Sequence, residues 1–162
     1  MLLALAAACS WAPGERGDDE PLRLHAQVVR SAHDTVRWAT PALARFCRDG
    51  RSLLLEGASE RGNGVLVLVR FGDSLDAGPF PLLLLGDSLS PRGAAVAVRY
   101  MTNGVSHGFT LDSGAVELQP ARHALGAHVR GTGVETAVRV ALDAEYAGVP
   151  LASDSVPCGF QP

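Results

Sequence analysis

The sequence contains no lysine, and all fourteen of its basic residues are arginines. We attribute this absence to a GC-rich coding sequence and draw no functional conclusion from it. Seventeen acidic residues outnumber the arginines and give a formal net charge of -3. The arginines are also dispersed, and they alternate with apolar residues, as in Val28-Val29-Arg30. Because a nucleic-acid-binding surface needs clustered basic side chains, we expect no nucleic-acid partner.

Long apolar runs and metal-binding patterns are also missing. No apolar run reaches the roughly 18 residues of a membrane-spanning helix. The three cysteines lack the CxxC spacing of a metal site, and the chain has no glycine-rich phosphate-binding loop. The adjacent acidic residues Asp18, Asp19 and Glu20 are typical of a solvated segment rather than of an acid/base pair. The sequence therefore predicts neither a metal nor another cofactor.

The first nine residues have features of a lipoprotein signal peptide. Residues 1–8 (MLLALAAA) are apolar, and small residues directly precede Cys9, which would become the lipid-carrying N-terminus. Two features depart from the usual pattern: Ala6 stands where leucine is commoner, and no basic residue precedes the apolar run. A cleaved secretory signal without lipid, or an apolar N-terminus on a cytosolic protein, is the alternative. We expect residues 1–9 to be the signal and Cys9 to anchor the protein to a membrane of the cell envelope.

The remainder divides into a tether and one domain. Residues 10–21 (SWAPGERGDDEP) are polar, acidic and rich in proline and glycine, so they predict a flexible tether. Residues 22–162 have a length that suits a single domain. The chain has 18 glycines and 10 prolines, with short Val/Leu runs between them, which is typical of a turn-rich β protein.

Cys47 and Cys158 remain as an even pair if Cys9 carries a lipid. In an oxidising compartment they would form a disulfide that joins the C-terminal tail to the first third of the domain. A bridge closing so long a loop would contribute up to about 4–5 kcal/mol in the chain-entropy model. The alternative is a pair of buried free thiols.

Apolar residues in the domain recur mostly with the period of two that is typical of strands. Residues 65–71 carry Leu and Val on both faces, which predicts a central strand buried on both sides. Pro79 and Pro81 confine the start of the next strand to an edge or a bulge. Strands are expected over residues 22–28, 35–39, 51–55, 65–71, 80–85, 94–100, 105–111, 115–118, 123–130 and 135–144.

The segment Pro41–Cys47 fits two structures. Thr40 as the N-cap, Pro41 at the first position and Gly50 past the end would frame a short helix. The alternating apolar residues and the turn signal Asp49-Gly50 instead favour a strand that enters a hairpin, which is our interpretation.

The last third predicts a meander of adjacent strands. Asn103-Gly104 is a hairpin signal, Ser113-Gly114 would open a strand, and Gly131-Thr132-Gly133 would turn the chain before residues 135–144, with Val138 pointing inward. Turn signals every 8–12 residues are typical of sandwiches and barrels. The sequence therefore predicts an all-β fold: a single antiparallel β-sandwich or flattened barrel with a C-terminal meander.

The order of these motifs resembles a family of uncharacterised bacterial lipoprotein β-domains. The matching segments are Trp38-Ala39-Thr40, 77–82 (AGPFPL), 113–118 (SGAVEL) and 125–131, which ends at a glycine. The resemblance covers roughly residues 24–151. It implies a sandwich-like fold and a place in the cell envelope, and it implies no activity.

Residues 71–75 (FGDSL) resemble the nucleophile block of the GDSL esterase and lipase family, whose serine, here Ser74, attacks an acyl carbonyl. The resemblance implies a base from an Asp-x-x-His near the C-terminus and a Gly-x-Asn-Asp block for the oxyanion hole, and the sequence contains neither. The tetrapeptide also recurs at Gly86–Leu89, and Gly-Asp-Ser is good turn composition. We interpret both copies as turns and expect no catalytic residue.

The five histidines do not form a recognisable ligand pattern. His123 and His128 are five residues apart, so one strand would place them on opposite faces. His25, His33 and His107 lie in separate segments. We therefore expect all five to be solvated or hydrogen-bonded on the surface.

These observations predict an exported, non-enzymatic β-domain that is anchored through Cys9. It would act as a binding or structural module of the cell envelope, with an envelope protein or ligand of unknown identity as its partner. Two alternatives remain: a serine esterase that uses Ser74, and a carrier that holds an apolar ligand inside the barrel.

Overall fold

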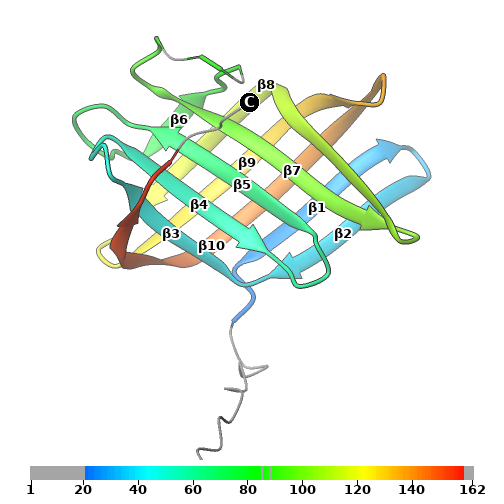
Figure 1. The fold of residues 1–162 in the computed structure, drawn as a ribbon, viewed down its shortest axis with the longest axis horizontal. Helices are drawn as coiled ribbons and strands as arrows, with labels where there is room; N and C mark the ends of the chain where they lie inside the picture. The colour runs from blue at the N-terminus through cyan, green and yellow to red at the C-terminus, as the bar shows by residue number, and fades with distance from the viewer. Residues whose placement is uncertain (1–20, 85, 88, 159–162) are drawn as a thin grey trace, which may run out of the picture.

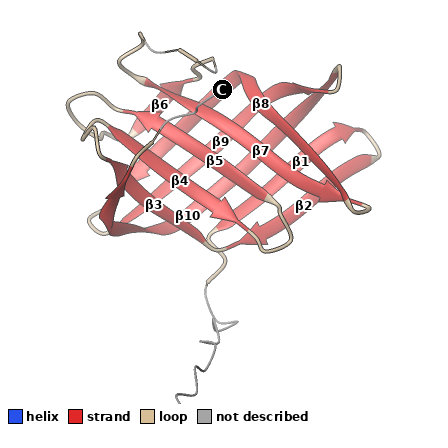
Figure 2. Ribbon diagram, in the orientation of Figure 1, coloured by secondary structure: helices blue, strands red, loops and turns tan. Residues whose placement is uncertain are grey.

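The computed structural model describes residues 21–84, 86–87 and 89–158, and this part of the chain is all-β with no helix (Figure 2). Nowhere in these residues is there a helix long and apolar enough to span a membrane. The ten strands are β1 (Leu24–Ser31), β2 (Asp34–Thr40), β3 (Ala42–Cys47), β4 (Ser52–Ala58), β5 (Gly64–Arg70), β6 (Gly78–Pro81), β7 (Gly93–Thr102), β8 (Val105–Pro120), β9 (Ala124–Glu135) and β10 (Val138–Val156).

The strands form two sheets that share β8 and β10 (Figure 1). The first sheet has the order β2-β1-β10-β9-β8-β6, and the second has the order β10-β3-β4-β5-β7-β8. All pairs are antiparallel except β3 with β10. The ring β10-β3-β4-β5-β7-β8-β9 closes on itself, and β8-β9-β10 is a meander. This flattened barrel with a C-terminal meander confirms the predicted fold class.

The two shared strands are long because each passes from one sheet into the other. β8 has 16 residues, and its pairing with β9 shifts by one residue between Leu111 and Ser113. β10 has 19 residues, and its register shifts between Tyr146 and Val149, beside Gly148 at φ +56°. Such bulges bend a strand, and here they turn it around the edge of the barrel.

Alternate residues of the strands point between the sheets and form one core. Leu24, Val67, Phe80 and Leu118 are all fully buried. Tyr146 is buried too, and its hydroxyl donates a hydrogen bond to the carbonyl of Val65 at 2.7 Å. This hydrogen bond satisfies the Tyr146 hydroxyl inside the otherwise apolar core.

Several local predictions are confirmed. Pro41–Cys47 is not a helix, because residues 42–47 form β3 and the turn at Asp49-Gly50 leads into β4. Asn103-Gly104 is the turn between β7 and β8. Cys47 and Cys158 form the predicted disulfide, with a Cα–Cα distance of 5.4 Å.

The prediction for residues 80–85 was wrong in extent. The strand is β6, which ends at Pro81 and pairs with β8 at the edge of the first sheet. β5 pairs with β4 and β7 in the second sheet. The prolines explain the edge position, because each lacks the N–H that an inner strand needs. β5 is central as predicted, but its outward Leu66 is only half-buried.

Two predicted turns of the meander were also wrong. Ser113-Gly114 lies within β8, and Gly131-Thr132-Gly133 lies within β9, so the chain turns at Thr136-Ala137 instead. β10 accordingly begins at Val138, which points outward and is half exposed.

Close backbone approach explains these strand glycines. A Cβ at Gly114 would lie 2.1 Å from the carbonyl oxygen of Arg130, and one at Gly133 would lie 2.1 Å from that of Thr110. Such distances exclude any side chain. The glycines mark the corner at which β8 bends against β9, rather than a turn between strands.

Replacing a corner glycine tests this explanation. Gly133→Ala should lower the free energy of unfolding by about 2–3 kcal/mol, because the new methyl group forces β8 and β9 apart. Gly126→Ala on the same strand is the control, since its Cβ would meet no atom closer than 3.5 Å. Urea unfolding measures both variants, and equal losses for the two would contradict the explanation.

The disulfide should stabilise the domain mainly by restricting the unfolded chain. It closes a loop between residues 111 positions apart, so reduction should cost about 4–5 kcal/mol of unfolding free energy. Urea unfolding with and without reductant measures this loss. The double variant Cys47→Ser, Cys158→Ser should not respond to reductant, and a wild-type protein equally insensitive to it would contradict the prediction.

Candidate functional site

The serine considered for chemistry in the GDSL motif lies between two strands. Ser74 is exposed in the connection between β5 and β6, and its hydroxyl donates to the carboxylate of Asp76 at 2.6 Å. Ser88 and Cys9 lie outside the described residues, as does the segment 1–20. No group of three potential metal ligands occurs within residues 21–158 as described.

The second GDSL copy contains a turn stabilised by its aspartate. The Asp87 carboxylate accepts hydrogen bonds from the backbone N–H groups of Leu89 and Ser90 and from the Ser90 hydroxyl, at 2.7–2.9 Å. Asp49 makes the same three bonds in the turn between β3 and β4. Hydrogen bonds from Ser90 lower the pKa of Asp87 below its ordinary value. These contacts are those of an Asx turn.

Four histidines are surface residues, as expected. His25, His33 and His123 are exposed, and His128 pairs with Asp143 at 2.9 Å on the outer face of the first sheet. The expectation was wrong for His107, which points inward from β8 and has 17% of its side chain exposed.

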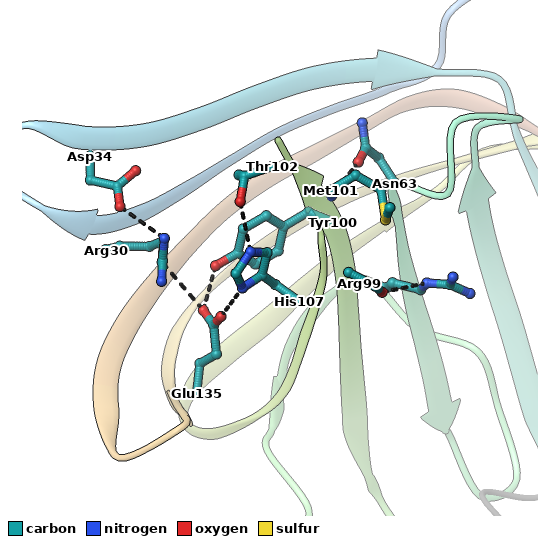
Figure 3. A network of polar contacts seen from close by, with 10 residues as sticks. Arg30, Asp34, Asn63, Arg99, Tyr100, Met101, Thr102, His107 and Glu135 are labelled. Carbon is teal, nitrogen blue, oxygen red and sulfur yellow. Dashed lines mark hydrogen bonds and ion pairs between the residues drawn. The ribbon is translucent and has the colours of Figure 1, made fainter. Parts of the chain in front are cut away.

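His107 belongs to a polar cluster at one end of the barrel. The β1–β2, β7–β8 and β9–β10 hairpins all turn at this end (Figure 1). The inward-facing positions of their strands continue past the apolar core and carry polar side chains there (Figure 3). We call this cluster the hairpin-end network, and its members are Arg30, Asp34, Tyr100, Thr102, His107 and Glu135.

Glu135 is the centre of the network and the one buried carboxylate of the described residues, with 5% exposure. Its oxygens accept hydrogen bonds from the Tyr100 hydroxyl and from His107 Nδ1, the latter at 2.5 Å. Arg30 Nε lies 3.5 Å from the carboxylate, and Arg30 also binds Asp34 at 3.0 Å. Three hairpins are therefore joined through one side chain, as Figure 3 shows.

The proton on His107 can be assigned from its partners. A carboxylate oxygen only accepts, so Nδ1 carries a hydrogen. In the neutral ring Nε2 then accepts from the Thr102 hydroxyl at 2.6 Å. Both ring nitrogens are therefore hydrogen-bonded, Nδ1 to Glu135 and Nε2 to Thr102.

Burial and hydrogen bonding act in opposite directions on Glu135. Burial raises the pKa of its carboxyl group, but hydrogen bonds from Tyr100 and His107 and the charge of Arg30 outweigh burial and hold the pKa below its ordinary value. Burial, followed by the bond to Glu135, raises the pKa of Tyr100. Glu135 is therefore an anion and Tyr100 a hydroxyl donor at neutral pH.

Aromatic rings extend the network to β2. Tyr100 stacks between Trp38 and His107, with ring centroids 6.3 Å and 5.0 Å apart and interplanar angles of 13° and 16°. The buried Nε1 of Trp38 has no hydrogen-bond partner among the described residues. The stack holds β2 against the β7–β8 hairpin, with which β2 shares no backbone pairing.

The turn that follows Glu135 is strained. Thr136 and Ala137 adopt φ values of +43° and +68°, which residues with a Cβ rarely adopt. Each such residue costs roughly 1–2 kcal/mol. The bonds of Glu135 fix the end of β9 directly before this turn. The arrangement holds three hairpins together.

Comparison with known proteins adds no assignment to this geometry: no family model, curated protein or solved structure matches the chain.

Sequence reasoning missed the hairpin-end network because its members are far apart in the chain. The available signal was alternation: Glu135 follows Val129, Gly131 and Gly133 at steps of two, so it shares their inward face. Because a turn was predicted at Gly131–Gly133, Glu135 was not recognised as part of the same strand as Val129.

Glu135→Gln tests the network through its pH dependence. Because the folded pKa lies below the ordinary 4.5, the stabilisation by Glu135 is complete above pH 4.5 and is lost as the pH falls through the folded value. At neutral pH the variant should lose roughly 1–3 kcal/mol of unfolding free energy. That difference should shrink in acid.

Urea unfolding across the pH range measures this effect. Glu117→Gln is the control, since Glu117 is exposed on the outer face of β8. A loss for Glu135→Gln that stays constant from neutral to acid pH would contradict an ionised, hydrogen-bonded Glu135.

Proposed function

We propose that this protein is an exported, lipid-anchored binding or structural module of the cell envelope, without catalytic activity. The observation that carries the proposal is the disulfide between Cys47 and Cys158. Disulfides persist in oxidising compartments and are rare in the cytosol. The bridge therefore supports export, which the apolar leader before Cys9 predicts independently.

The cysteine arrangement also supports the lipid anchor. Two of the three cysteines are paired, which leaves Cys9 as the third. In a secreted chain an odd cysteine needs a partner or a modification. Lipidation at Cys9 supplies that modification and places a membrane among the partners of this protein.

The side-chain contacts support a non-catalytic role. The polar atoms of Glu135 and His107 are occupied by one another and by Tyr100, Arg30 and Thr102. Ser74 donates to Asp76 rather than to a histidine. Ser74 therefore lacks the histidine base that a serine nucleophile of the GDSL type uses.

The outer face of the first sheet is suited to water. One cross-strand row carries His25, Glu145, His128 and Glu117, and the next row carries Arg37, Gln27, Asp143 and Arg130. These rows mix acidic, basic and neutral polar side chains, which favours solvation without a field of one sign. We infer that recognition uses the edges and ends of the barrel.

Substitution of Cys9 tests the anchor. Cys9→Ser should move the protein from the membrane fraction to the soluble fraction, because the thioether-linked lipid can no longer form. Ser10→Ala keeps the cysteine and should stay with the membrane. Fractionation followed by immunoblotting reads both variants. Membrane association that survives Cys9→Ser, or a wild-type protein in the soluble fraction, would contradict the proposal.

A further inference from the structure

A pocket lies on the outer face of the second sheet, at the end opposite the hairpin-end network. Its volume is about 220 Å³, which is below the roughly 300–1,000 Å³ of pockets for drug-sized ligands. Strands β4, β5 and β7 form its floor, and the β3–β4 turn and the β6–β7 connection form its walls. Cys158, which the disulfide fixes to Cys47, also lines it. The pocket therefore suits a small molecule.

Arg70 lies on the floor at one end of the pocket. Its backbone pairs with Ser52 of β4 and with Gly93, the first residue of β7. A guanidinium carries five N–H donors, and among the described residues this one donates only to the carbonyl of Ser90, at 3.3 Å. No ion pair of the described residues includes Arg70. Its guanidinium therefore has donors for an anionic group of a ligand.

Two carboxylates stand on the walls near Arg70: Asp49 in the β3–β4 turn and Asp87 in the β6–β7 connection. Burial raises the pKa of Asp49, but the hydrogen bonds of its turn and the charge of Arg70 outweigh burial and lower the pKa. Hydrogen bonds from Ser90 and Leu89, with a further contribution from the charge of Arg70, lower the pKa of Asp87. Both are anions at neutral pH, so the described lining residues carry two negative charges and one positive charge.

Each of these carboxylates has room for one more donor. Oδ1 accepts two backbone N–H groups and Oδ2 accepts one serine hydroxyl in both turns, whereas a carboxylate offers about four lone-pair sites. The remaining site is on Oδ2 of Asp49 and of Asp87. An ammonium group has three N–H donors, so it has one for each carboxylate.

The other end of the pocket is apolar. Leu68 of β5 lies opposite Ala95 of β7, one outward-facing row closer to the middle of the sheet than Arg70. Two residues along a strand span about 6.6 Å, which sets the separation of these rows. Leu83 donates its N–H to the carbonyl of Ala94 and so lies beside the apolar row. The pocket therefore matches a ligand with a charged head and a short apolar side chain.

We propose that this pocket binds a small apolar amino acid as its zwitterion. The ligand carboxylate pairs with Arg70, and its ammonium group pairs with Asp49 and Asp87. Its side chain lies on Leu68 and Ala95. A simple anion would meet two carboxylates and a simple cation would meet the guanidinium, so only a ligand of both signs pairs with all three groups. This inference rests on the proposed role as a binding module and names its ligand class; it depends on neither export nor the lipid.

Calorimetric titration of the full chain in detergent with L-leucine tests the proposal. Two matched probes each lack one charged group: 3-methylbutylamine lacks the carboxylate, and 4-methylpentanoate lacks the ammonium group. L-Leucine should bind, and each analogue should bind roughly tenfold more weakly or worse, because it leaves charged groups of the pocket unpaired.

Substitutions in the pocket should change these affinities in opposite directions. Arg70→Gln should weaken L-leucine binding roughly tenfold and strengthen 3-methylbutylamine binding, because it removes the one cation among the described lining residues. Asp87→Asn should weaken both of these ligands and strengthen 4-methylpentanoate binding. Asparagine keeps the turn, since its carbonyl accepts the same N–H groups.

Matched controls separate the pocket from net charge. Arg99→Gln and Asp73→Asn make the same charge changes at exposed positions outside the pocket and should leave every affinity unchanged. The comparison of the three probes on the wild type needs no variant, so it tests the proposal even if a substitution unfolds the protein.

No binding of L-leucine at millimolar concentration would overturn the proposal. Equal binding of L-leucine and 3-methylbutylamine would indicate a cation site, and equal binding of L-leucine and 4-methylpentanoate would indicate an anion site; either result contradicts a zwitterion. Binding that Arg70→Gln and Asp87→Asn leave unchanged would contradict this pocket. Because calorimetry in detergent does not depend on the lipid, these failures are distinct from a failure of the anchor, which fractionation of Cys9→Ser measures.

Discussion

The pairing of β9 on both of its edges is the constraint on which the rest of the structure depends. β9 binds β8 on one side and β10 on the other, so it closes the ring of strands. Closure requires β8 and β10 to change sheets, which they do at bulges and at glycines that no side chain could replace without moving the backbone. The disulfide from Cys47 to Cys158 then fixes the tail beyond β10 to the end of β3.

Closure also determines where polar side chains must go. Because side chains alternate between faces, a strand that continues beyond the apolar core keeps pointing its alternate residues inward. At the hairpin end these residues are Arg30, Tyr100, His107 and Glu135, and they satisfy one another around a single carboxylate. Trp38 stacks on Tyr100 and attaches β2, which among the described residues pairs only with β1. The same network thus supports a strand at the edge of the first sheet.

Turn signals and strand periodicity predicted most of the strands from the sequence. They did not predict how β9 closes the ring of strands. Asn103-Gly104 and Asp49-Gly50 turn as their φ preferences require, and the pair of cysteines is bridged. Gly131 and Gly133 were predicted to form a turn. They are instead needed because their backbone lies close to β8, and the neighbouring sequence gives no sign of such a tertiary contact. Glu135 was missed for the same reason: its partners come from three other strands, and only tertiary contacts show that it is buried. Cys9 remains a prediction from the sequence.

Titration of Glu135 by NMR of its labelled carboxyl carbon tests the central claim most directly. If the carboxylate is buried and held by Tyr100, His107 and Arg30, its pKa should lie below the ordinary value of 4.5, and Tyr100→Phe should raise it. A Glu135 pKa at or above 4.5 in the folded wild type would contradict the account. It would mean that burial of the carboxyl group outweighs its hydrogen bonds, and that the hairpin end is not joined through an anion.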